Sequence, residues 1–108
     1  MDTTKLLEER ARARAAKRQA DAELYSFHEH AIAALLDHVH GHDVRVQALA
    51  TIALWERERL CHVRYIAAWR AILAQPPAAV SAAILRADDE GVVLRQNTPF
   101  GFLRRAAG

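Results

Sequence analysis

The sequence predicts an all-α protein, a small helical bundle in a single domain. Hydrophobic residues make up 52% of the 108 residues, and many of them are alanine, the strongest helix former. Glycine occurs only four times and proline three times, so few positions interrupt a helix. Apolar side chains recur with the period of an amphipathic helix. We expect a long N-terminal amphipathic helix packed on an αα-hairpin and one or two short C-terminal helices.

The first helix is predicted from about Thr4 to His40, because this stretch contains no glycine or proline. Its apolar stripe is mostly alanine before Ala20, and from Leu24 onward several large apolar side chains widen it. A stripe of alanine buries little surface, whereas a stripe of large side chains needs a partner. Within the single domain 1–108, we therefore expect 1–22 to be a basic helix that can project, 23–95 the core, and 96–108 a tail.

Three further helices follow from local signals. Gly41 is expected to end the first helix, and Asp43 to cap a second one, Val44–Arg59, that packs antiparallel to the first. A third helix, Val63–Ala74, has the clearest apolar face and is stopped by a pair of prolines. A fourth helix is predicted at Ala78–Ala87. The acidic run after it either ends this helix or begins a last turn.

Basic residues concentrate in the first helix, although the formal net charge of the chain is only +2. On a helix, four of them cluster within about 100° of arc, and Arg12 points to the opposite side. Such a patch can be a solvated face, can bind an acidic protein, or can contact phosphates without reading bases. We expect a protein partner rather than a nucleic acid. The four clustered residues are Arg10, Arg14, Lys17 and Arg18.

The sequence also allows two other arrangements of helices. The first helix could pair with a second copy, which gives a possible homodimer, although alanine at the seam buries little area. That seam would consist of Leu6, Ala13, Ala20 and Leu24. The second and third helices resemble a helix-turn-helix in outline, but the turn lacks glycine, and Trp69 and Ile72 suit packing rather than DNA reading. An ordinary αα-hairpin is favoured.

The histidines offer a metal-binding alternative. His38, His40 and His42 lie close together in sequence, and imidazoles with nearby carboxylates suit zinc or nickel. Alternate residues point to different sides of a helix, so these three are weak candidates, and we expect no metal and no other cofactor. His28 falls on the apolar arc of the first helix. We expect it to be a hydrogen-bonded, partly buried histidine whose charge could switch near neutral pH.

The sequence contains no motif that predicts catalysis. Phosphate-cradling glycine loops and nucleophile elbows are absent, and the consecutive Cys61 and His62 are poorly placed to act as a nucleophile and base. The single cysteine suits a reducing compartment, and no apolar run is long enough to cross a bilayer. We therefore predict a cytoplasmic protein that is not an enzyme.

The C-terminal tail carries two aromatic residues, Phe100 and Phe102, after Pro99. They can fold back onto the core, which is the preferred interpretation, or form a short linear segment that binds a partner. The functional prediction is a non-enzymatic interaction or regulatory protein that uses the basic helix and possibly this tail. The alternatives are a dimeric nucleic-acid-binding regulator that contacts phosphates and a histidine-rich metal-binding protein.

Overall fold

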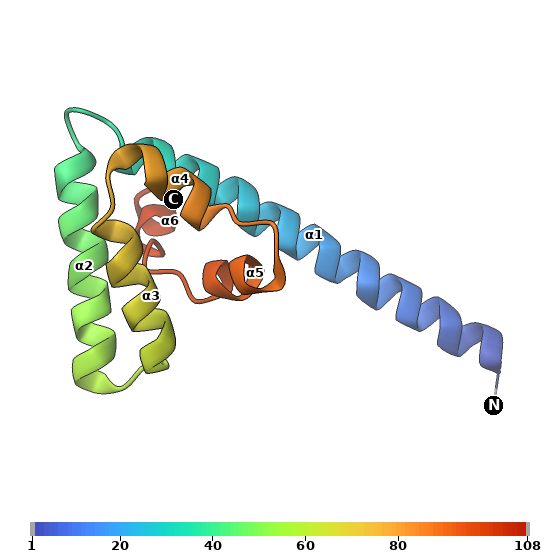
Figure 1. Cartoon of the computed structure of the whole chain (residues 1–108). Coiled ribbons are helices and arrows are strands. Elements are labelled where there is room, and N and C mark those ends of the chain that lie inside the picture. The colour runs from blue at the N-terminus through green and yellow to red at the C-terminus, as the bar shows by residue number, and fades with distance from the viewer. Residues whose placement is uncertain (1, 108) are drawn as a thin grey trace.

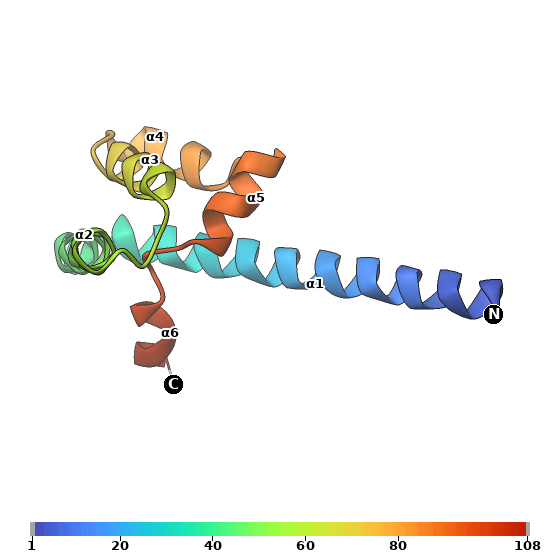
Figure 2. The same ribbon diagram turned by 90° about the horizontal axis from the view of Figure 1, so that it is seen from below.

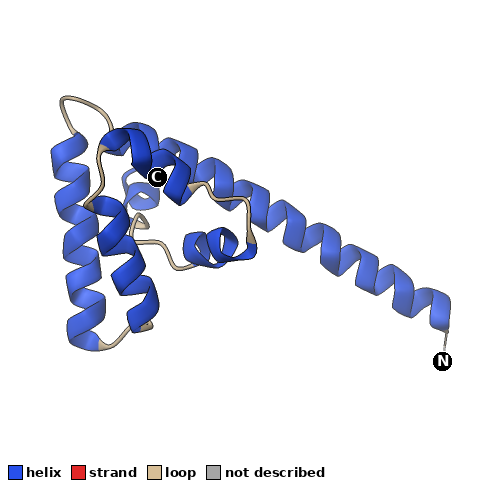
Figure 3. Cartoon of the chain, in the orientation of Figure 1, coloured by secondary structure: helices blue, strands red, loops and turns tan. Residues whose placement is uncertain are grey.

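The computed structural model describes residues 2–107, with side chains to residue 104, and every regular element in that range is a helix (Figures 1 and 3). The predicted fold class is therefore confirmed: a long N-terminal helix packs on later, shorter helices. The two end residues of the predicted domain 1–108 lie outside the described residues, as do the last side chains of the predicted tail. The helices are α1 Thr3–Leu35, α2 Gly41–Glu58, α3 Val63–Leu73, α4 Pro77–Ile84, α5 Asp89–Gln96 and α6 Phe102–Ala107.

Helix α1 begins with a capping hydrogen bond. The backbone N–H of Thr4 donates to the carboxylate of Asp2 over 3.0 Å. The helix has 33 residues, so it is about 50 Å long and accounts for most of the 57 Å extent of the molecule. Only its C-terminal half lies against the other helices (Figures 1 and 2).

The end of α1 lies earlier than predicted. The helix stops at Leu35 instead of His40, because the side chain of Asp37 takes over backbone groups that a longer helix would use. Its Oδ2 accepts hydrogen bonds from the N–H groups of Val39, over 3.0 Å, and His40, over 2.7 Å. The five residues after Leu35 therefore form the turn into α2.

The predicted capping at this junction is wrong. Gly41 does not follow the end of α1; it is the first residue of α2, and Asp43 lies inside the first turn instead of capping it. A Cβ atom at position 41 would overlap the backbone carbonyl oxygen of Leu35. Glycine is needed here because the first turn of α2 packs directly on the last turn of α1. The negative charge of Asp43 still suits a helix N-terminus.

Helices α2 and α3 form an antiparallel hairpin, as predicted. The hairpin turn ends at His62, whose Nδ1 accepts a hydrogen bond of 3.1 Å from the N–H of Arg64 and so caps α3. Helix α2 crosses α1 at a steep angle and does not run antiparallel along it, so that part of the prediction is wrong (Figure 1). The closest antiparallel neighbour of α2 is α3.

The C-terminal helices are short, and their limits depend on tertiary contacts. Helix α4 starts at Pro77 and ends at Ile84, three residues before the predicted end. The acidic run then begins a separate helix, because Asp88 caps α5 by accepting a 3.0 Å hydrogen bond from the N–H of Gly91. A short helix α6 ends the described chain where the sequence predicted only a tail.

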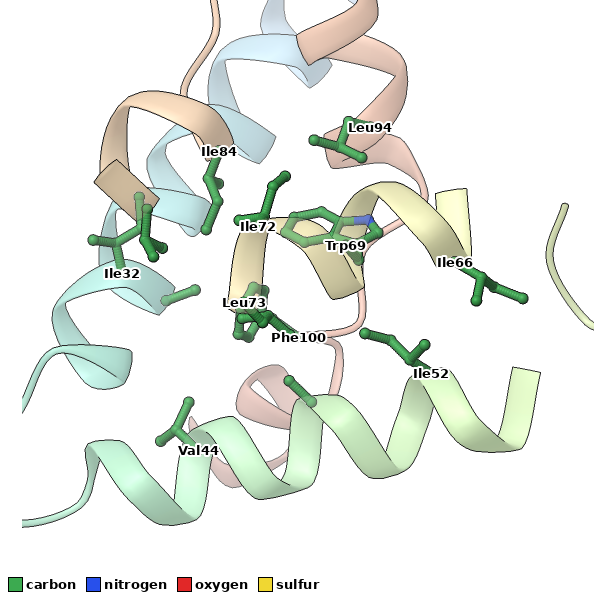
Figure 4. Packing of buried hydrophobic residues seen from close by; sticks show 13 residues of the cluster. Ile32, Val44, Ile52, Ile66, Trp69, Ile72, Leu73, Ile84, Leu94 and Phe100 are labelled. Carbon is green, nitrogen blue, oxygen red and sulfur yellow. The ribbon is translucent and has the colours of Figure 1, made fainter. Parts of the chain in front are cut away.

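The core lies where the C-terminal half of α1 meets the other helices (Figure 4). Trp69 and Phe100 are its largest fully buried side chains, and every helix from α1 to α5 contributes to it. No helix among the described residues combines the length and the apolar character needed to cross a membrane. The buried apolar residues are Ala31, Ile32, Val44, Ala48, Ile52, Ile66, Trp69, Ile72, Leu73, Val80, Ile84, Leu94 and Phe100.

Candidate functional site

The N-terminal half of α1 extends away from the bundle as a single exposed helix (Figure 2). Residues 7–20 are all exposed, and this segment, called the arm below, is about 21 Å long. It contains no glycine or proline and is rich in alanine, arginine and lysine, which favour helix without tertiary packing. Side-chain pairs four residues apart support its inner end: Lys17 with Asp21 at 3.0 Å and Gln19 with Glu23 at 2.9 Å.

The four predicted basic residues lie on the arm, and all are exposed. Arg10, Arg14 and Arg18 follow each other at intervals of four residues, so they form one row along the helix. Lys17 lies beside this row and forms an ion pair with Asp21. Among the described residues, the three arginines of the row form no ion pair. Their guanidinium groups are therefore available to a partner.

One carboxylate, that of Asp21, lies in line with this basic face at its inner end. Glu8, Glu9 and Glu23 also neighbour it in sequence, but each points more than 100° away around the helix. Residues 2–20 contain six basic and three acidic side chains, a net charge of +3, whereas the whole chain has +2. The remaining residues together are therefore slightly acidic, and the positive potential is confined to the arm.

The alanine seam predicted for self-association lies on the same helix. Its two alanines, Ala13 and Ala20, are exposed, while Leu6 and Leu24 at its ends are half-buried. Leu24 lies where α1 enters the bundle. The structure places this seam beside the basic face and leaves its centre open.

Of the three histidines proposed as weak metal ligands, His38 and His40 lie in the α1–α2 turn and His42 in the first turn of α2, and all three are exposed. The nearby carboxylate of Asp37 already accepts two backbone hydrogen bonds. Within residues 2–107, no three His, Cys, Asp or Glu side chains gather in a geometry that could hold a metal ion. The structure therefore does not bring His38, His40 and His42 together.

Helix α3 carries two exposed arginines, Arg64 and Arg70. Trp69 and Ile72 of this helix are buried, so the helix serves the core. Arg70 donates two hydrogen bonds to the carboxylate of Glu56 on α2, over 2.8 and 3.1 Å. Arg70 therefore ties the two helices of the hairpin together. Arg64 extends over the ring of Tyr65, at 5.5 Å from the ring centre.

The tail folds back onto the core. Phe100 is fully buried and meets Trp69 edge-to-face, with 5.7 Å between ring centres. Phe102 is half-buried against the core, and the guanidinium of Arg104 lies 4.4 Å from the ring centre of Phe27 on α1. Phe100 is therefore a core residue and offers no surface to a partner, while Phe102 offers part of its ring.

His28 anchors this folded-back segment. It is fully buried, its Nδ1 lies 2.8 Å from the carbonyl oxygen of Leu24, and its Nε2 lies 2.8 Å from the hydroxyl of Thr98. A carbonyl can only accept, so Nδ1 carries the proton, and the Thr98 hydroxyl donates to Nε2. The same hydroxyl accepts a 3.2 Å hydrogen bond from the N–H of Phe100. A continuous chain of hydrogen bonds thus joins α1 to the tail.

Burial lowers the pKa of His28, because the charged imidazolium loses its hydration. The hydrogen bond to Leu24 acts in the opposite direction, and the positive charges of Arg95 and Arg104 lower the pKa further. His28 is therefore held neutral. The sequence predicted a hydrogen-bonded histidine here, but its partner Thr98 is 70 residues away and could not be identified.

Sequence reasoning missed Arg95, a buried cation on α5. Its Nη1 donates hydrogen bonds to the carbonyl oxygens of Ile84, over 2.9 Å, and Arg86, over 2.8 Å. These carbonyls lie at and just beyond the end of α4, so Arg95 satisfies groups that the helix leaves unpaired. Its guanidinium also lies 5.2 Å from the ring centre of Tyr25 on α1. Arg95 therefore joins α4, α5 and α1.

A groove of about 510 Å³ lies between α3, α4 and α5. Its floor is apolar, formed by side chains such as Ile72 and Leu94, and its edge carries both signs of charge. Arg86 at that edge is already paired with Asp88 and Glu90. Among the described residues that line the groove there is no serine, cysteine or histidine, and its carboxylates and phenol belong to Asp89, Glu90 and Tyr65.

Comparison of the chain with known protein families, with curated proteins and with solved structures found no match.

Proposed function

We propose that this chain is a non-enzymatic interaction protein that binds an acidic surface of a protein partner through the basic face of its arm. The observation that carries this proposal is the full exposure of residues 7–20 together with their positive charge. An exposed helix that the core does not require is poorly explained by folding alone. Because the arm is already helical, binding to it costs little ordering entropy.

The short length of the basic face favours a compact acidic surface over a long polyanion. The row from Arg10 to Arg18 spans about 12 Å along the helix axis. A nucleic acid that followed the same side of the helix further would meet no basic residue before Arg10 and the carboxylate of Asp21 after Arg18. A protein patch of similar length would meet only the basic residues.

Nucleic-acid binding is the second candidate, and the three unpaired arginines of the row support it. This candidate predicts phosphate contacts without base readout and a steep dependence on salt. With three to four phosphates neutralised on a duplex, the slope of log K against log salt would be about −3. Dimeric protein would present two such arms.

The proposal can be tested by fluorescence anisotropy with two labelled probes, a synthetic Asp/Glu-rich peptide and a short random DNA duplex. Replacing Arg10 and Arg14 by glutamine should weaken peptide binding by about tenfold. The matched control replaces Lys5 and Arg12, which share the opposite side of the same helix, and should change affinity much less. Equal losses in both double variants, or no peptide binding, would contradict the proposal. Tighter binding to the duplex, with the salt slope above, would favour the second candidate.

A further inference from the structure

Helix α2 carries apolar residues on two opposite faces. On the inner face, Val44, Ala48 and Ile52 are buried, and the labelled Val44 and Ile52 point into the core (Figure 4). On the outer face, Val46 is 48% exposed and Leu54 is 40% exposed, with the exposed Ala50 between them. A helix with two apolar faces is typical of one covered on both sides.

The outer face has a two-fold pattern centred on Ala50. Val46 and Leu54 lie four residues before and after it, and Asp43 and Arg57 lie seven residues before and after it. At 100° per residue, all of these fall within about 40° of the direction of Ala50. All five side chains are exposed. The face is therefore complementary to itself when one copy is turned antiparallel to the other.

We propose that this outer face of α2 binds a second copy of the chain, with α2 antiparallel to its counterpart and Ala50 at the two-fold axis. The small side chain of Ala50 lets the two helix backbones approach closely, and Val46 and Leu54 are covered on either side of it. Asp43 of one copy then lies opposite Arg57 of the other, at both ends of the contact. An interface in which the same patch serves both copies is the usual form of a homodimer.

The charges on the outer face of α2 favour a second copy of the chain as the partner that covers it. Among the described residues, the one ion pair of Arg57 is with its neighbour Glu58, with 3.5 Å between Nε and Oε1, and both side chains are largely exposed. Such an exposed contact contributes little, so the guanidinium is free to bridge to Asp43 of the other copy. The single helix face is smaller than the roughly 800 Å² that each partner of a standard interface buries. We therefore expect a dissociation constant in the micromolar range.

The dimer leaves the arm free. Helix α2 lies at the end of the molecule opposite to the N-terminus, as both views show (Figures 1 and 2). This inference does not depend on the proposed function, because the two contacts use different helices. Dimerisation would also place two basic arms on one particle, which raises the avidity for a partner with two acidic sites.

The first test is sedimentation equilibrium of the full chain up to about 1 mM, the range where weak homodimers form. The wild type should become dimeric as its concentration rises. Ala50→Glu places two carboxylates at the axis and should raise the dissociation constant by at least about tenfold. Ala13→Glu is the matched control, an exposed alanine at the centre of the arm seam, and should leave dimerisation unchanged. A wild type that stays monomeric, or a dimer disrupted by Ala13→Glu but not by Ala50→Glu, would overturn the inference.

A charge swap tests the antiparallel register. Asp43→Arg and Arg57→Asp each put like charges at both ends of the contact, so each variant alone should dimerise more weakly. An equal mixture of the two restores both opposite-charge pairs and should form a heterodimer about as tightly as the wild type. Circular dichroism of each variant shows whether the chain keeps the helix content of the wild type. If both variants are folded and the mixture associates no better than each alone, the proposed pairing is wrong.

Discussion

The hydroxyl of Thr98 is the best single probe of how the tail is held on the core. It donates to His28 Nε2 and accepts from the N–H of Phe100, so Thr98→Val leaves two buried polar groups without a partner. Each unsatisfied buried group costs about 1–3 kcal/mol, while valine keeps the shape of threonine. We expect the free energy of unfolding to fall by about 2–6 kcal/mol.

Urea denaturation followed by tryptophan fluorescence measures this change, and Trp69 packs 5.7 Å from Phe100. The denaturant slope should stay constant if only stability changes. Thr51→Val is the matched control, because the Thr51 hydroxyl bonds only the Gln47 carbonyl on the half-exposed side of α2. It should change stability by less than about 0.5 kcal/mol. A Thr98→Val variant as stable as the wild type would refute the assignment of the hydrogen-bond chain.

Two further predictions follow from His28 and from Gly41. Burial lowers the pKa of His28 in the folded chain, so as the pH falls the unfolded chain binds a proton at this histidine before the folded chain does. The free energy of unfolding should therefore stay constant above about pH 6.5 and decrease below it, by up to about 1.4 kcal/mol per pH unit. Chemical denaturation between pH 7 and 5 should show this loss, and in His28→Gln the free energy of unfolding should depend less on pH. If the variant keeps the pH dependence of the wild type, a group other than His28 causes it. Gly41→Ala should cost about 1–3 kcal/mol by thermal or urea unfolding, because its Cβ would overlap the carbonyl of Leu35. Gly101→Ala, where a Cβ meets nothing within 4 Å, should be neutral, and equal effects of the two alanines would contradict this account.

The sequence predicts the helices well where the signals are local. The apolar period of α3 and the pair of prolines that stops it are signals from near neighbours in the chain, and both act as expected. The α1–α2 junction was mispredicted because glycine was interpreted as a helix end. Its actual role is to allow two helices to approach, which depends on how they pack.

The candidate sites, too, could be predicted only where the signal lies in neighbouring residues of the sequence. A stripe made mostly of alanine was enough to suggest that the residues before Ala20 are not needed by the core, and residues 7–20 are exposed. The partner of His28 could not be predicted, because it lies 70 residues away in a turn. The outer face of α2 was also missed. Once one apolar face of a helix is assigned to the core, a second one is recognised only when its exposure is known.

The arm and the core-packed part of α1 are one unbroken helix, and this fixes the direction in which the basic face points around the helix axis. With no glycine or proline between Thr3 and Leu35, the direction in which Arg10 and Arg14 point is set by how the bundle holds the other half of the helix. Two extra residues inserted near Ala20 would turn the basic face by about 200°, while seven would turn it by only about 20° and move it outward by about 10 Å. The length of the arm and the orientation of whatever binds it are therefore coupled, and a change in one is tolerated only in steps of whole helical turns.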